Sequence, residues 1–171
     1  MIKTFFLGFV LFSLSVRAQT DSLFANAAIL KMKHSKEYTI KVAQLMPVSK
    51  YGYKASPEEM SFEQQLLHVV KGMQSLCKDY LGGGPNTIQV PDSNLDKDET
   101  IKVLNTVYDY AINSLENFKP NQLSDTVSFF IKPMNKLRII NLMNDHQTHH
   151  RAQLVVYLRM NGIKPPDYVG W

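Results

Sequence analysis

The longest helical pattern predicted in this chain lies between Lys132 and Met160 and reads KPMNKLRIINLMNDHQTHHRAQLVVYLRM. It ends at Asn161-Gly162, and Pro165-Pro166 follow directly, as is typical of a helix C-terminus. On a helical wheel with about 100° per residue, one stripe within about 60° of His146 carries both apolar and polar residues. The members of this stripe are Ile139, Met143, His150, Gln153 and Tyr157. The segment is therefore predicted to bury a helix face on which two histidines lie one turn apart.

Three further segments show apolar residues at helical spacing, namely Asp21–Met46, Ser61–Leu81 and Lys97–Phe118. The second begins with Ser61-Phe62-Glu63-Gln64, which has the pattern of a capping box. Breaks rich in Gly and Pro separate the segments. Four amphipathic helices joined by loops predict an all-α fold, a four-helix bundle.

One segment between the third and fourth predicted helices has strand-like composition. Thr126–Ile131 is β-branched and aromatic. A single strand would have nothing to pair with, so we interpret this segment as an extended loop and predict no strand in the chain.

Length and composition indicate one folded domain preceded by a targeting segment. The chain has 171 residues, of which 44% are apolar and 20% charged. Residues 1–18 combine a basic start at Lys3, an uncharged run from Thr4 to Val16 and small residues before Gln19. This pattern is typical of a secretory signal peptide, and the apolar run is shorter than the ~20 residues of a membrane-spanning helix. We therefore predict cleavage near Ala18-Gln19, a domain over residues 19–171, and a periplasmic or secreted protein.

The charge balance and the single cysteine exclude several classes of function. The formal charge of +4 includes Lys3 and Arg17, and their removal with the signal peptide leaves +2. A nearly balanced chain without clusters of Lys and Arg is a poor match to nucleic acid. The lone Cys77 excludes a disulfide framework and a thiolate metal cluster, and we predict that it is buried and unreactive.

The histidines are the residues that indicate a metal site. His146 and His150, four residues apart on a buried stripe, can direct both imidazoles at one cation. His68 in the second helix is the best third ligand, because Gly72, one turn later, removes side-chain bulk beside it. His34 lies among lysines and His149 points to the other side of the helix, so neither is predicted to be a ligand. Satisfied core histidines are the alternative interpretation.

A zinc-protease interpretation of the same stretch is disfavoured. The spacing of His146 and His150 matches that of H-E-x-x-H metalloproteases, whose Glu is the general base. Here Gln147 occupies that position and cannot accept a proton, and Asp145 lies on the wrong side of the helix.

The same residues also resemble a known family. The run Asp145–Gln153, followed by Tyr157-Leu158-Arg159, Gly162 and Pro165-Pro166, is similar to the C-terminal signature of the DinB-like family. Upstream, Met46-Pro47, Tyr51, Tyr53 and the segment Ser61–His68 resemble the family's approach to its second helix. The similarity covers nearly all of residues 19–171 in the expected order.

The resemblance implies an up-down-down-up bundle, a divalent metal such as Zn²⁺ or Ni²⁺, and His68, His146 and His150 as its ligands. It also implies a homodimer and, from some relatives, transfer or isomerisation reactions that use a small thiol. Ala152 replaces the family's usual Gly without a consequence for ligation. The predicted export weakens the thiol interpretation, because cytosolic thiols are scarce outside the cell.

Two functions follow as hypotheses. The first is a metal-dependent hydrolase or thiol-type transferase acting on a small molecule, in which the cation activates a water or a thiol. Gln153, Tyr157 and Arg151 are its candidates for contacts to the ligands or to the substrate, with packing or solvation as the alternative for each. The second is a non-catalytic structural or stress-related bundle stabilised by metal.

Overall fold

The computed structural model describes residues 2–169, with side-chain burial from residue 19 onward. Four long helices make up most of the chain: α1 (Ile2–Leu45), α2 (Phe62–Tyr80), α3 (Lys97–Glu116) and α4 (Lys136–Met160). Two short 3-10 helices, η1 (Val48–Lys50) and η2 (Pro120–Gln122), lie in the connections. Two strands, β1 (Thr126–Phe129) and β2 (Lys132–Asn135), form a hairpin between α3 and α4.

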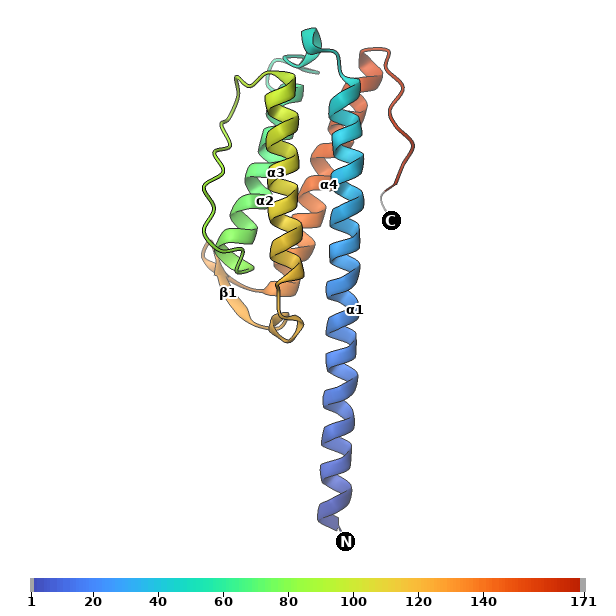
Figure 1. The fold of residues 1–171 in the computed structure, drawn as a ribbon, viewed down its shortest axis with the longest axis vertical. Coiled ribbons are helices and arrows are strands. Elements are labelled where there is room, and N and C mark those ends of the chain that lie inside the picture. Colours follow the sequence, from blue (N-terminus) through green and yellow to red (C-terminus); the bar gives the residue numbers. More distant parts are fainter. Residues whose placement is uncertain (1, 170–171) are drawn as a thin grey trace.

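The helices run up, down, down and up in chain order (Figure 1). The connection between α2 and α3, residues 81–96, returns along the outside of the bundle, so that these two helices start at the same end (Figure 1). The hairpin lies at the opposite end, beside the start of α4. The predicted all-α, up-down-down-up bundle is therefore confirmed.

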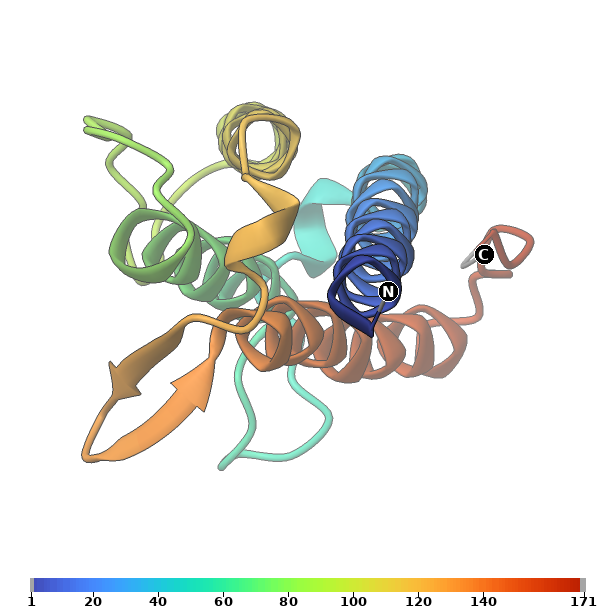
Figure 2. The same cartoon turned by 90° about the horizontal axis from the view of Figure 1, so that it is seen from below.

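Each helix packs against two neighbours, in the cyclic order α1, α3, α2, α4. Seen along the bundle, α2 lies beside α4, and the hairpin projects outward from their end (Figure 2). Since α2 and α4 are antiparallel neighbours, side chains from the middle of each helix meet at the same height. This pairing brings together the histidines that the sequence analysis selected.

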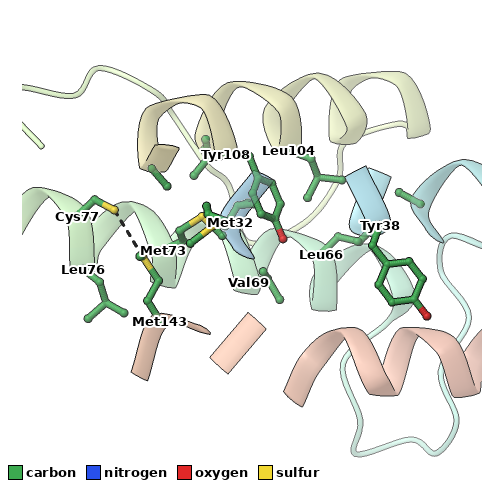
Figure 3. Packing of buried hydrophobic residues seen from close by; sticks show 14 of the residues in the cluster. Met32, Tyr38, Leu66, Val69, Met73, Leu76, Cys77, Leu104, Tyr108 and Met143 are labelled. Atoms are coloured by element: carbon green, nitrogen blue, oxygen red, sulfur yellow. Dashed lines mark hydrogen bonds between the residues drawn. The ribbon is translucent and has the colours of Figure 1, made fainter. Parts of the chain in front are cut away.

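Methionines and leucines fill the core between the four helices (Figure 3). Met32 of α1, Met73 of α2, Leu104 of α3 and Met143 of α4 are all fully buried or nearly so. Burial of such side chains contributes roughly 1.5–3 kcal/mol each to folding. The apolar faces of all four helices thus pack together in one common core.

Cys77 lies in this core, where its Sγ is 3.6 Å from Met143 Sδ (Figure 3). Burial raises the pKa of the Cys77 thiol to about 12, so that the thiolate is scarce at neutral pH. We therefore expect no reaction of the native protein with Ellman's reagent at pH 8 and one equivalent after unfolding in guanidinium. Fast labelling of the native protein would contradict this placement of Cys77.

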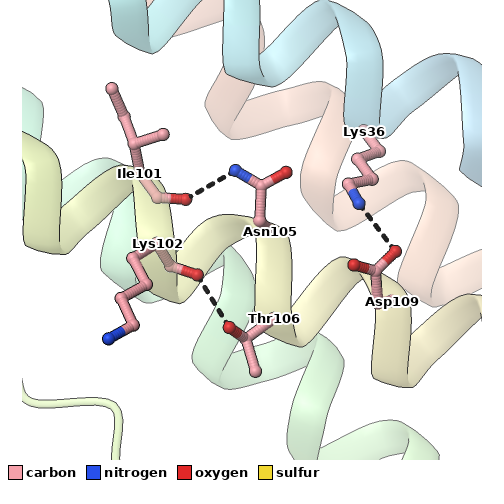
Figure 4. A network of polar contacts seen from close by, with 6 residues as sticks. All are labelled: Lys36, Ile101, Lys102, Asn105, Thr106 and Asp109. Atoms are coloured by element: carbon pink, nitrogen blue, oxygen red, sulfur yellow. Dashed lines mark hydrogen bonds and ion pairs between the residues drawn. The ribbon is translucent and has the colours of Figure 1, made fainter.

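Polar side chains line the outer surface where α1 packs against α3. Lys36 Nζ lies 2.6 Å from an Asp109 carboxylate oxygen (Figure 4). Beside it, Asn105 and Thr106 of α3 donate hydrogen bonds to carbonyls of their own helix (Figure 4). Exposed ion pairs contribute only about 0.2–1 kcal/mol, so the apolar core accounts for most of the packing energy.

The prediction for residues 126–135 is wrong in two respects. Thr126–Ile131 was expected to be a loop and helix four to begin near Lys132, whereas β1 pairs with β2 from Thr126↔Asn135 to Phe129↔Lys132. The strand that pairs with β1 is β2, and its residues had been predicted to form the first turn of the fourth helix. The helix begins at Lys136 because the Asn135 side chain accepts a hydrogen bond from the Arg138 N–H at 3.0 Å.

The first helix also differs from its prediction. It was expected to begin near Asp21, but α1 runs without a break from Ile2 to Leu45 and is longer than α4. The signal-peptide prediction concerns residues 1–18, whose side chains lie outside the described part of the structure. Within the described residues, no helix combines the length and apolarity needed to span a membrane.

Candidate metal centre

Three histidines from two helices meet on one side of the bundle. His68 comes from α2, and His146 and His150 lie one turn apart on α4. The Nε2 atoms of His68 and His146 are 3.1 Å apart, and one ring nitrogen of each histidine lies within 4.8 Å of the others. Tetrahedral zinc with Zn–N bonds of about 2.0–2.1 Å places its nitrogen ligands about 3.3 Å apart. The His68–His146 pair is close to this spacing, and the three nitrogens together could hold one small cation.

The three imidazoles differ in their access to solvent. His150 is buried, His146 is half-buried and His68 is exposed. Burial, together with His146 and His68, lowers the pKa of His150 to about 4. Burial is also the main cause that lowers the pKa of His146, and the nearby His68 contributes in the same direction. His146 and His150 therefore keep a free lone pair at neutral pH, which is the form that binds a metal.

Gln65 orients His150 toward the cluster. The Gln65 side chain is fully buried on α2, and its Oε1 lies 2.6 Å from His150 Nδ1. An amide oxygen only accepts, so Nδ1 carries the proton and Nε2 is left as the ligand nitrogen. The Gln65 amide nitrogen donates in turn to Gln153 Oε1. Nothing in the sequence predicted this role for Gln65, because a glutamine three residues before His68 has no distinctive spacing.

We expect Gln65→Ala to weaken zinc binding by about 10- to 100-fold, the usual effect of losing an outer hydrogen bond to a ligand histidine. Gln65→Glu, which retains an acceptor, should bind zinc like the wild type. Gln74→Ala is the matched control, since Gln74 lies on the same helix and donates to the Ile88 carbonyl instead. Competition with a fluorescent chelator measures these affinities. Equal zinc affinity of Gln65→Ala and Gln74→Ala would contradict the orienting role.

Gly72 leaves room for the ring of His146. A Cβ built on Gly72 would lie 2.8 Å from His146 Cε1 and 3.2 Å from its Nδ1. These distances are shorter than ordinary van der Waals contacts, so any larger residue would displace the imidazole. The prediction that Gly72 removes side-chain bulk beside His68 is therefore wrong in its partner, because the three atoms nearest to this Cβ all belong to His146.

The three residues suggested as contacts to ligands or substrate lie in different places. Gln153 is joined to the cluster through Gln65, and its own amide nitrogen is 3.4 Å from His149 Nε2. Tyr157 is buried and donates to the Met60 carbonyl at 2.9 Å. It belongs to the hydrophobic core, and its ring centroid lies 5.6 Å from that of Tyr53.

Arg151 and Gln147 face away from the cluster. The Arg151 guanidinium is buried against α1, with its central carbon 5.2 Å from the Tyr38 ring centroid. Gln147 accepts a hydrogen bond from the buried Tyr108 hydroxyl at 3.0 Å. Both side chains therefore belong to the core. Gln147 is also misplaced for the role of the metalloprotease glutamate.

The remaining two histidines lie outside the cluster. His149 is exposed, and its ring centroid is 5.0 Å from that of His150. His34 is half-buried on α1. Neither contributes a nitrogen to the group of three that could hold a cation.

The fold and the histidine cluster define a class of protein, a four-helix bundle with three clustered histidines between its second and fourth helices. Residues 24–170 match the DinB family, and the chain belongs to this family. The predicted family resemblance is therefore confirmed.

Individual relatives are distant in sequence. The chain is 21% identical over 141 residues to the uncharacterized protein YjoA of Bacillus subtilis, a match that covers 81% of this chain and 91% of YjoA. The crystal structure of a DinB-like protein from Bacillus cereus superposes with a TM-score of 0.73 at 17% identity, covering 84% of this chain and 97% of that one. For the YjoA structure the TM-score is 0.69 at 18% identity, with coverages of 83% and 96%. At these identities the similarity establishes the shared fold.

Proposed function

We propose that the protein binds one divalent cation, Zn²⁺ or Ni²⁺, through His68, His146 and His150. The observation that carries this proposal is the convergence of three ring nitrogens within 4.8 Å of one another. Imidazole nitrogens suit both metals. The hydrogen bond from His150 to Gln65 supports the assignment, because metal-binding histidines commonly donate their second nitrogen to an outer partner.

An accessible coordination position favours a catalytic role. Among the described residues, no fourth His, Cys, Asp or Glu joins the group of three. The exposed His68 leaves one side of the cluster open to solvent. Structural zinc sites are closed by four protein ligands, whereas catalytic sites retain a position for water or substrate. This arrangement supports a metalloenzyme.

The reaction that we propose is metal-dependent hydrolysis or thiol transfer on a small molecule. When bound, the cation would supply Lewis acidity and lower the pKa of a coordinated water or thiol. The chain's own residues hold the site in shape: Gln65 fixes the tautomer of His150, and Gly72 accommodates His146. We also propose that this chemistry takes place outside the cytoplasm, on the basis of the signal-type pattern in residues 1–18.

A non-catalytic role is the second candidate, because the cluster bridges two helices. A cation bound to α2 and α4 at once would stabilise the folded state in proportion to its affinity. This function requires a metal but no substrate, so the two candidates differ in a measurable way.

Metal-dependent turnover tests the proposal. We expect protein that begins at Gln19 and carries one equivalent of zinc or nickel to act on panels of ester, amide or thiol-transfer substrates. The activity should disappear with a chelator and return with the metal. His149→Ala serves as the control that alters an adjacent histidine without removing a proposed ligand. A metal-dependent rise in Tm without turnover in any panel would favour the structural role instead.

A further inference from the structure

An apolar cavity of about 600 Å³ opens beside the histidine cluster. Gly72 and His146 line one end, and Asp79 and Tyr80 line the other. At 1.5 Å per residue along α2, the two ends are about 10–12 Å apart. The volume lies within the range of small-molecule sites, roughly 300–1,000 Å³. The cavity is therefore long enough for one elongated small molecule that reaches the cluster at one end.

The hairpin supplies the outer wall of this cavity. Phe129 and Phe130 line it from the hairpin, opposite Leu76 of α2 and Leu142 of α4. The ring centroids of Phe129 and Phe130 are 4.7 Å apart, and those of Phe129 and Tyr80 are 5.5 Å apart. The wall is thus a short row of aromatic rings, which suits an aromatic or otherwise flat apolar body.

Phe130 occupies a backbone conformation that is unfavourable for a large side chain. It is the first residue of a two-residue turn, and its φ is +53°. Positive φ in such turns is typical of Gly, Asn or Asp. The Phe130 side chain is nevertheless 84% exposed, so packing within the fold does not account for an aromatic residue here. Strain of this kind is commonly retained at binding sites.

The charge of the cavity restricts its ligand further. Of the residues that line it, Asp79 is acidic and none is Lys or Arg. Asp79 lies at the end away from His146, where a carboxylate attracts a cationic group and repels an anionic one. The ligand thus needs a donor atom at one end, an apolar body and a neutral or positive tail.

We propose that this cavity is the substrate site, and that it selects a flat apolar molecule with a metal-binding head at His146 and an amino group beside Asp79. The inference rests on the proposed function, because the head requires a cation at the three histidines. Phe130 acts as a specificity residue that covers the apolar body, and Asp79 selects the charge of the tail.

Three hydroxamates serve as probes with the same metal-binding head. Acetohydroxamic acid lacks the body, whereas 4-(aminomethyl)benzohydroxamic acid and 4-carboxybenzohydroxamic acid share the body and differ in the charge of the tail. Binding to cobalt(II)-loaded protein is followed by the visible absorption of the cobalt. We expect the amino probe to bind about tenfold more tightly than acetohydroxamic acid and several-fold more tightly than the carboxy probe.

Two variants test the two residues. Phe130→Gly relieves the turn, so it should fold at least as well as the wild type, yet lose about threefold or more in affinity for both aromatic probes. Ile131→Ala is the matched control, because Ile131 shares the turn and is 92% exposed but does not line the cavity. Asp79→Asn should remove the preference for the amino probe without changing the affinity for acetohydroxamic acid.

Unchanged probe affinities in Phe130→Gly, or an unchanged preference in Asp79→Asn, would overturn the inference. So would a dimer that Phe130→Gly converts to a monomer in sedimentation, since the aromatic wall would then be an interface between two copies. Failure of the metal proposal is separable, because cobalt would then not bind at all. In that case, 4-methylbenzylamine added to metal-free protein should still shift the NMR methyl signals of Leu76 and Leu142, and absence of these shifts would reject the cavity itself.

Discussion

Replacing His146 and His150 together with Ala is expected to abolish stoichiometric zinc binding. The double variant leaves only His68, whose exposed imidazole cannot hold the cation by itself. Loss of an outer-shell residue alone commonly costs 10- to 100-fold in metal affinity, so removal of two direct ligands should cost more than about 100-fold. Elemental analysis after dialysis against trace zinc measures the bound metal, and circular dichroism verifies the fold.

Two single variants are controls for this experiment. His149→Ala removes an exposed histidine from the same turn of α4, and His34→Ala removes one from α1. Both proteins should retain one zinc per chain. Equal zinc content in the double variant and the wild type would reject the site. Loss of zinc in His149→Ala would mean that a different set of nitrogens holds the cation.

Gly72→Ala is expected to change stability and metal affinity in opposite directions. Alanine in a helix interior is favoured over glycine by up to about 1 kcal/mol, so the free energy of unfolding of the metal-free protein should not fall if the His146 ring rotates away. The new methyl group would lie 2.8 Å from His146 Cε1, and the displaced ring would no longer meet His68. We expect zinc affinity to decrease by at least about tenfold, by analogy with other losses of ligand positioning.

Urea unfolding without metal and chelator competition with metal separate these two effects. Gly52→Ala is the matched control, because a Cβ at Gly52 has no atom within 4 Å. That variant should bind zinc as the wild type does. Wild-type zinc affinity in Gly72→Ala would show that His146 does not depend on the space beside Gly72, and the proposed coordination would have to exclude it.

Local patterns were sufficient to predict the helices of the bundle. The capping box at Ser61 and Gln64 is present, with hydrogen bonds of 2.9 and 3.2 Å, because both of its partners lie within one turn of chain. The hairpin was missed for a related reason. Its turn, Phe130-Ile131, lacks the Gly or Asn that usually marks such turns, and its second strand contains Pro133. Residues 130–133 therefore contain no local sequence pattern that would predict a hairpin.

The site was partly predictable. His146 and His150 follow from helical spacing, because residues four apart lie on one face of any α-helix. His68 was selected by elimination, by its neighbour Gly72 and by the family resemblance. Gln65, in contrast, acquires its role only through a contact with a residue 85 positions away in the chain. The contribution of Phe129 and Phe130 to the cavity also requires knowledge of where the hairpin folds back.

By itself the sequence determined where the four helices end, where α2 and α3 begin and which face of each helix is buried, since these properties depend on residues within one or two turns. Only the tertiary structure decided the height at which α2 and α4 face one another. That alignment places His68 Nε2 3.1 Å from His146 Nε2 across 78 residues of chain. Periodicity is unchanged when one helix slides along its neighbour, so the relative height is set by the packing of the whole core. The same packing brings the aromatic hairpin beside the histidines.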